Sequence, residues 1–277
     1  MLSRIIGASS RAFLVALLFV TPALMLPLIS SDAIEIILLF AFFAACLVLI
    51  EYGSAYPSII EFRDAPPFNR LRFLAIFLAV FSLSVIARGQ FAPNAFTSFL
   101  QTLGIVVGEF IDFPYSPVRL MVLMLPSDAS PDLIQAVRTS SGLSYLISLL
   151  TLAIFYFYVR ILGWPARKGG FNVWINLPLF DPTTRGDVLP RLHRDGRLNI
   201  ALGFLSPFLI PAIVGMVSDL IDPIYLEDPM TLIWTISAWA FIPLSLIMRG
   251  MAMTRVAEMI RENRERAYAA ARTMQTV

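Results

Sequence analysis

Six strongly apolar stretches of this chain run for 15 to 21 residues without a charged side chain. They cover residues 12–31, 36–50, 73–87, 139–159, 198–218 and 229–248. A helix needs about 20 apolar residues to cross a hydrocarbon layer about 30 Å thick. Only α-helices and closed barrels satisfy their backbone hydrogen bonds within lipid. We therefore predict an all-α, polytopic transmembrane helical bundle with about six spans.

The composition supports lipid as the solvent of this fold. Of the 277 residues, 58% are hydrophobic and 14% are charged, whereas soluble proteins average about a quarter charged residues. The apolar residues also come in blocks and not with the periodicity of a soluble core. The net charge of only +2 gives no polyelectrolyte character, so we expect no nucleic-acid partner.

We place the spans at about 12–31, 33–53, 73–87, 139–159, 198–218 and 229–248, in a single transmembrane domain over residues 1–248. Arg4 and Arg11 precede the first run, as in a signal peptide. That run has 20 residues, whereas a cleavable core has about 7–15. It also lacks an Ala-x-Ala sequence at its end, so we expect an uncleaved first span.

The basic residues orient the bundle. With the N-terminus inside and six spans, 18 of the 21 Lys and Arg residues fall on the inner side, and only Arg88, Arg119 and Arg138 fall outside. Cytoplasmic loops carry such an excess of basic residues. We expect a protein of the bacterial inner (plasma) membrane with both termini cytoplasmic and lipids around it.

The outer loop, residues 89–138, contains a short amphipathic segment. Apolar residues recur at helical spacing over residues 96–111, which predicts a helix in the outer interface; a re-entrant hairpin over residues 96–125 is the alternative. A full extra crossing would reverse the charge asymmetry. Gly104 and Gly108 have the spacing of a helix-packing motif. Asp112, just beyond them, is expected on a solvated edge.

Two inner segments are candidate contact surfaces. The inner basic loop, residues 163–199, carries Arg191, His193, Arg194 and Arg197, which we expect to contact the membrane surface or a partner. Residues 249–277 form a predicted cytoplasmic C-terminal helix with charge pairs at i, i+4 spacing. This helix either follows the inner surface or docks a partner.

The sequence offers no catalytic, cofactor or metal site. Cys46 and His193 are the only cysteine and the only histidine, which excludes a disulfide within the chain and a thiolate zinc site. Phosphate-loop, His-Glu-x-x-His and Gly-x-Ser-x-Gly motifs are absent, and the spans lack charges in their middles.

These absences favour a non-enzymatic function. We expect a subunit, scaffold or assembly factor of a larger membrane complex, with other membrane protein subunits as partners. A transporter or channel for a neutral or apolar solute is the alternative, since prolines kink several spans and free carbonyls to line a cavity. A lipid-modifying enzyme, acting at residues 181–197, is third.

Overall fold

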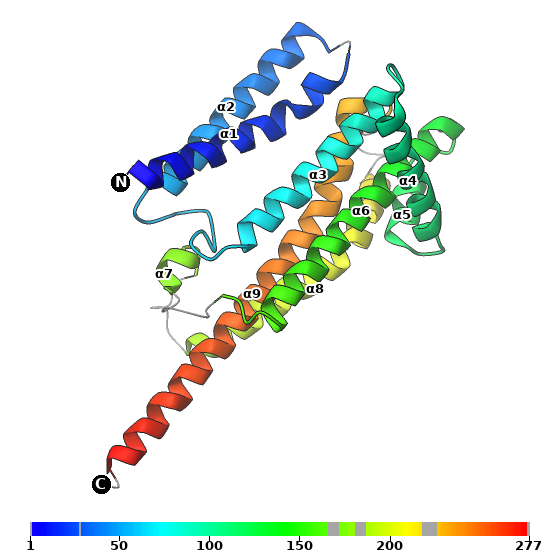
Figure 1. Cartoon of the computed structure of the whole chain (residues 1–277). Helices are drawn as coiled ribbons and strands as arrows, with labels where there is room; N and C mark the ends of the chain where they lie inside the picture. Colours follow the sequence, from blue (N-terminus) through cyan, green and yellow to red (C-terminus); the bar gives the residue numbers. More distant parts are fainter. Residues whose placement is uncertain (1, 28, 166–171, 181–186, 218–225, 276–277) are drawn as a thin grey trace.

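The chain folds into a bundle of α-helices, seen in a computed structural model (Figure 1). The structure describes residues 2–27, 29–165, 172–180, 187–217 and 226–275, and within these ranges it has no strand. The helices are α1 (Leu2–Met25), α2 (Ser31–Gly53), α3 (Phe68–Gly89), α4 (Ala95–Ile111), α5 (Pro117–Leu123), α6 (Pro131–Arg160), α7 (Val173–Asn176), α8 (Val188–Val217) and α9 (Pro229–Gln275). Of these, α1, α2, α3, α6, α8 and α9 are long and apolar enough to cross a membrane. The prediction of an all-helical chain with six such helices is confirmed.

Hydrogen-bonding caps set where several helices begin. The Ser30 hydroxyl accepts a hydrogen bond from a backbone N–H in the first turn of α2. Ser130 does the same for α6, with a proline at the first helical position. Asn94 and Thr97 form a reciprocal capping box at the start of α4. Such caps satisfy backbone donors that a helix leaves unpaired at its N-terminus.

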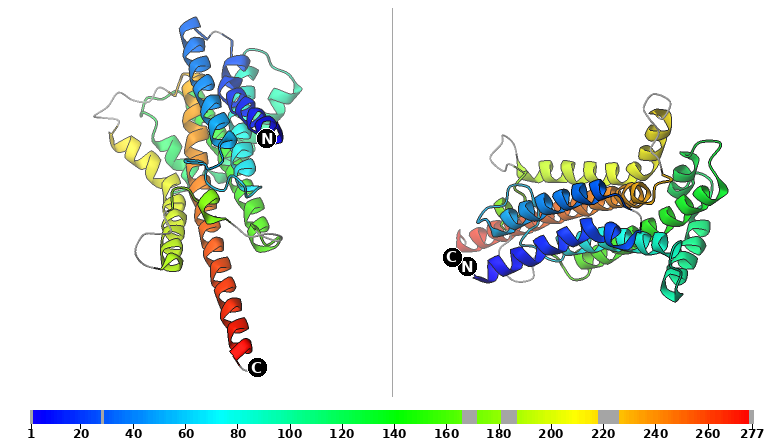
Figure 2. Two further views of the ribbon diagram at one scale, coloured as in Figure 1. Left: turned by 90° about the vertical axis from the view of Figure 1, so that its left-hand side faces the viewer. Right: turned by 90° about the horizontal axis from the view of Figure 1, so that it is seen from above.

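Helix α9 is the central element, since it packs against α3, α6 and α8. It also continues beyond the other helices, and we call the end of the bundle where it does so the tail end and the opposite end the far end (Figures 1 and 2). One buried apolar cluster includes Phe62, Phe68, Trp164 and Met248. A second cluster includes Val80, Met121 and Ile236.

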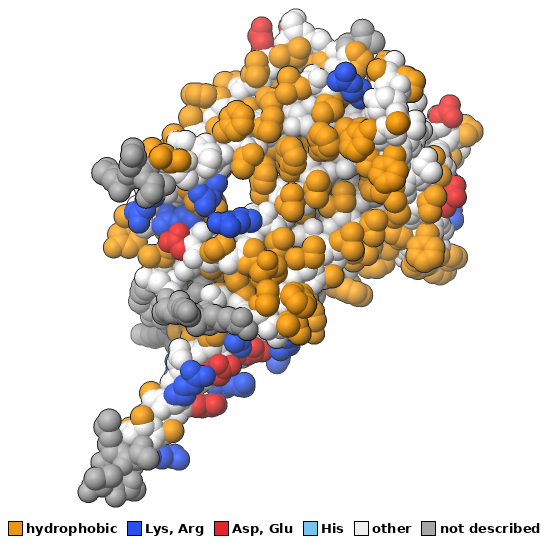
Figure 3. Space-filling view, in the orientation of Figure 1, with side chains coloured by type: hydrophobic (Ala, Val, Ile, Leu, Met, Phe, Trp, Pro, Cys, Tyr) orange, Lys and Arg blue, Asp and Glu red, His pale blue; other side chains and the backbone are white. Residues whose placement is uncertain are grey.

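Helix α2 is peripheral. It packs against α1 and exposes most of its apolar side chains. Only 6% of its most apolar stretch of 18 residues is buried. Figure 3 shows hydrophobic side chains covering much of this face of the molecule, with Lys and Arg gathered toward the tail end. Such an apolar exterior suits a protein whose solvent is lipid.

Helix bounds differ from the predicted spans at several ends. Helix α1 ends at Met25, short of the predicted span end at residue 31. Helix α8 begins at Val188, so residues 188–199 of the predicted inner basic loop are helical. The charged residues there did not end the helix, because Arg and Leu are good helix formers. Residues 166–171 and 181–186 of that loop lie outside the described residues.

Helix α4 is the amphipathic helix predicted over residues 96–111. It packs against α3 and α6, and Figure 2 shows it at the far end, at a steep angle to the long helices. That angle distinguishes α4 from the long helices, which run side by side. Its position in the interface of a membrane stays a prediction.

Candidate functional site

The predicted contact residues of the inner basic loop lie in the first turns of α8, at the tail end. Arg194 and Arg197 are exposed, whereas Arg191 and His193 are half-buried. The Arg191 guanidinium lies 4.8 Å from the centre of the Phe180 ring, as in a cation–π contact. Arg194 makes an exposed ion pair with its neighbour in sequence. Arg194 and Arg197 thus present charge to the outside.

A glycine contact holds this basic end of α8 against α9. A Cβ added at Gly250 would lie 2.5 Å from the Gly196 carbonyl oxygen, and one at Gly203 would lie 2.8 Å from the Pro243 carbonyl oxygen. Backbones approach this closely only where side chains are absent. Sequence reasoning missed this contact, although the seven-residue spacing of the α8 glycines is a signal for it.

Gly104 and Gly108 lie at the contact between α4 and α6. A Cβ at Gly104 would lie 2.7 Å from Thr139 Cγ2, and one at Gly108 would lie 2.7 Å from the Arg138 carbonyl oxygen. Gly142, on the facing side of α6, was not singled out from the sequence. Its added Cβ would lie 2.7 Å from the Gly108 backbone nitrogen. The two helices therefore touch backbone to backbone.

Beside this contact, Asp112 directly follows α4 and forms ion pairs with two arginines. Its carboxylate lies 2.7 Å from Nε of Arg119 in α5 and 2.7 Å from Nε of Arg138 in α6, and its side chain is only 5% exposed. The expectation of a solvated edge was wrong for this residue, because α5 folds back and brings an arginine over it. The cluster ties α4, α5 and α6 together.

A second ion-pair network lies at the tail end, in the loop between α2 and α3. Nε and a terminal nitrogen of Arg249 donate to the Glu61 carboxylate at 2.5 and 2.8 Å, and Glu61 is buried. Asn69 donates to the Glu61 carbonyl oxygen. Arg72 donates to the Ser245 hydroxyl, which joins α3 to α9. The network clamps this loop onto α9.

The rest of this loop is equally well supported. The Glu51 carboxylate accepts hydrogen bonds from the backbone N–H groups of Ser58, Ile59 and Ile60. Phe62, at φ 53°, is fully buried against Phe68 and other aromatic rings. A non-glycine residue at positive φ needs such support from its surroundings. We interpret this network as structural, because its polar groups bind one another.

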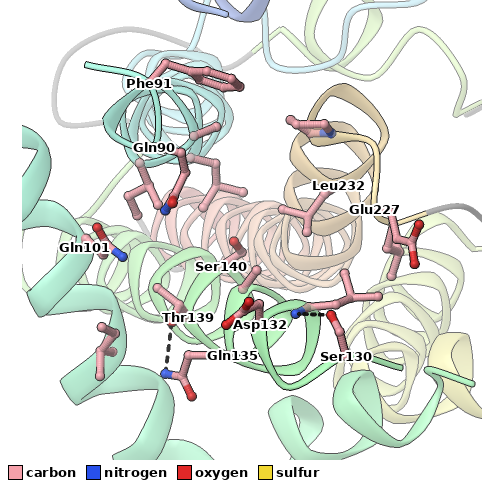
Figure 4. Close-up of a pocket in the computed structure, with 18 residues that line it drawn as sticks. Gln90, Phe91, Gln101, Ser130, Asp132, Gln135, Thr139, Ser140, Glu227 and Leu232 are labelled. Atoms are coloured by element: carbon pink, nitrogen blue, oxygen red, sulfur yellow. Dashed lines mark hydrogen bonds between the residues drawn. The ribbon is translucent and has the colours of Figure 1, made fainter. Parts of the chain in front are cut away.

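The far end holds a cavity of about 580 Å³ between α3, α4, α6 and α9 (Figure 4). Its lining combines apolar side chains with amides, hydroxyls and two carboxylates, and it includes no Lys or Arg. The lining residues are Leu83, Ile86, Ala87, Gln90, Phe91, Gln101, Ile105, Ser130, Asp132, Leu133, Gln135, Ala136, Thr139, Ser140, Leu226, Glu227, Pro229 and Leu232.

The polar groups of the cavity differ in depth. Ser140 is only 4% exposed and points into the cavity, and it makes no hydrogen bond within the described part of the chain. Gln135 donates weakly to Thr139, at 3.4 Å. Asp132 and Glu227 are exposed at the rim. Sequence reasoning missed this site because its residues come from separate helices and have no common spacing.

Comparisons with known proteins leave the chain without an assigned family. No protein-family model, curated protein or solved structure matches it. The six long apolar helices are those of a multi-pass membrane protein. Among the described residues, no group of three or more His, Cys, Asp or Glu side chains is placed to hold a metal ion.

Proposed function

We propose that the protein is a non-enzymatic subunit or scaffold of a larger membrane complex. The observation that carries this proposal is the tail, residues 261–275, in which α9 continues past the bundle as a single helix (Figure 1). Nearly all side chains described from residue 261 onward are exposed. At 1.5 Å per residue, these 15 residues reach about 22 Å beyond residue 260.

A helix without packing needs support from a partner. In proteins most of the stability of a helix comes from packing of one of its faces and not from helix propensity. The tail has ion pairs between Arg261 and Glu265 and between Glu262 and Arg266, each of which adds a few tenths of a kcal/mol at most. A partner that packs on the tail supplies the burial that it lacks within its own chain.

The charges indicate an acidic partner. The tail carries four Arg and two Glu residues, and Arg194 and Arg197 are exposed at the same end of the bundle. Arg264 and Asp187 connect the tail to the start of α8 at 3.0 Å. The hydrogen bond from Arg264 lowers the pKa of the Asp187 carboxyl below its ordinary value. The tail thus leaves the bundle beside the exposed arginines.

This proposal places the tail end at the cytoplasmic face of a bacterial inner membrane, with both termini inside. Most basic residues belong to segments at that end, as the charge rule for cytoplasmic loops requires. Helix α4 then lies at the outer interface, as an interfacial helix or part of a re-entrant hairpin.

A pull-down tests the proposal. Tagged full-length protein is extracted in mild detergent and compared with a chain that stops after residue 260. We expect a stoichiometric acidic membrane protein with the full chain and none with the shortened chain. Recovery of the protein alone, or of the same partner with both chains, contradicts tail docking.

Matched substitutions of Arg191, Arg194 and Arg197 separate charge from geometry. Changing all three to Lys keeps the charge and should retain the partner, whereas changing all three to Gln should weaken association and its dependence on salt. If the triple Lys variant inserts normally but does not retain the partner, the guanidinium geometry matters, because Lys cannot make a bidentate contact.

The far-end cavity favours a second candidate function, the binding or transport of a small solute. Substrate sites in transporters combine apolar walls with a few polar groups. The test is solute uptake into proteoliposomes, with a Ser140→Leu variant that fills the cavity as the control. Uptake that is equal with both proteins contradicts transport through this cavity.

A further inference from the structure

We infer that the far-end cavity binds a small organic cation, namely an amine with an apolar body. This inference names the ligand class for the second candidate function and uses the same cavity. It is independent of partner binding by the tail, which lies at the opposite end of the bundle.

The size and walls of the cavity fit a small organic molecule. Ligand sites have volumes of about 300–1,000 Å³ and are lined mainly by apolar side chains, and this cavity has about 580 Å³. Leu83, Ile86, Ile105 and Leu232 contribute apolar walls from three helices. They bury the body of a ligand and shield it from water.

Ser140 supplies the second observation that points to a ligand. A hydroxyl can both donate and accept a hydrogen bond. Ser140 is 4% exposed, and its hydroxyl faces the cavity without a partner among the described residues, so it is available to a ligand there (Figure 4). A serine in a helix can bond to its own backbone, as Ser84 does in α3, but Ser140 does not. A polar ligand atom in the cavity would supply the hydrogen bond that the Ser140 hydroxyl lacks.

The charges of the lining select a cation. Asp132 and Glu227 form no ion pair within the described part of the chain, and no basic residue lines the cavity. The nearby Arg138 directs its guanidinium to Asp112 and Gln135, so its charge is already paired. Rim carboxylates attract a positive charge and repel an anion.

The remaining polar groups suit the same ligand. The carbonyl oxygens of the Gln90 and Gln101 amides accept hydrogen bonds from an ammonium group. Phe91, half-exposed at the rim, offers a ring face to a cation. In this arrangement the ammonium donates to the Ser140 hydroxyl oxygen, and the apolar body lies against the leucine and isoleucine side chains of the cavity wall.

Three probes with one apolar body test the inference. We choose 4-phenylbutylamine, 4-phenylbutanol and 4-phenylbutyrate, which carry a positive, a neutral and a negative head group. Binding to the full-length protein in nanodiscs of zwitterionic lipid is measured by calorimetry, with empty nanodiscs as the blank. At low salt we expect the amine to bind about tenfold more tightly than the alcohol and the carboxylate to bind most weakly. Added salt should narrow the difference.

Matched variants then locate the binding site. The double variant Asp132→Asn, Glu227→Gln should bring the amine down to the affinity of the alcohol and leave the alcohol unchanged. The control, Glu109→Gln, Asp128→Asn, removes two carboxylates that do not line the cavity and should keep the tenfold difference. Ser140→Leu should abolish binding of both probes.

Several results would overturn the inference. These are absence of binding by all three probes, equal binding of the amine and the carboxylate, and an equal loss in the control variant. Because the rim substitutions lie on the surface, they test the charge preference even if the Ser140 variant fails to fold. Amine binding without any uptake into proteoliposomes would contradict transport and leave the binding site established.

Discussion

Replacing Gly142 by alanine should loosen α4 from α6. The added Cβ would lie 2.7 Å from the Gly108 backbone nitrogen and 3.2 Å from the Val107 carbonyl carbon. Favourable contacts between carbon atoms need about 3.5–4.0 Å, so the helices must separate by about 1 Å at this point. Since the opposing atoms are backbone, no change of rotamer can make room.

The expected magnitude follows from two opposing effects. Overpacking of a close contact costs about 1–3 kcal/mol, and alanine returns about 1 kcal/mol through its higher helix propensity. We therefore expect Gly142→Ala to lose up to about 2 kcal/mol, which is up to about 30-fold in the ratio of folded to unfolded protein. Gly53 is the matched control, since its added Cβ meets no atom within 4 Å. Gly53→Ala should be neutral or up to about 1 kcal/mol more stable.

The assay is unfolding in mixed micelles, followed by tryptophan fluorescence and circular dichroism as the denaturing detergent is increased. Hydrogen exchange adds a local measurement, because separation of the helices should reduce protection within α4 and leave α2 unchanged. If Gly142→Ala is as stable as Gly53→Ala, the close contact between α4 and α6 is not as described and the steric argument fails.

Three further predictions follow from the ion pairs and the charge distribution. Glu61→Gln should lower stability by about 1–3 kcal/mol in the same unfolding assay, because Arg249 would lose a charged hydrogen-bond partner; an unchanged midpoint would contradict this. In intact cells lacking the native cysteine, Tyr268→Cys should be shielded from an impermeant thiol reagent and Asp128→Cys labelled; the reverse pattern would invert the proposed topology. Because an arginine hydrogen bond lowers the Asp187 carboxyl pKa, that ion pair contributes above the ordinary value of 3.8 and is lost as pH falls below it. Asp187→Asn should therefore reduce hydrogen-exchange protection of the tail at neutral pH and make no difference at strongly acidic pH.

The long helices could be predicted from the sequence because lipid imposes a simple rule on each of them. A strongly apolar run without charge is visible locally, and six such runs became six long apolar helices. Helix ends were less predictable, as α6 begins at Pro131 although its uncharged run begins at Thr139. Charge marks the edge of the apolar layer, whereas a cap such as Ser130 marks where the helix starts.

The sites could be predicted only where the signal is local. Gly104 and Gly108 stand one turn apart on one helix, so their spacing is visible, but Gly142 opposite them has no sequence relation to either. Glu61 and Arg249 are 188 residues apart, and neither residue type nor spacing links them. The far-end cavity combines four helices, so its polar groups come together only in the folded bundle.

The ion pair between Glu61 and Arg249 also orders events during synthesis. Glu61 is made before most of the bundle, and its partner arrives only when the last long helix has been translated. Until then the loop after α2 carries a carboxylate without its guanidinium, in a place that becomes buried. A chain that stops before α9 leaves this carboxylate without its partner, so the loop after α2 can complete its packing only after α9 has been made.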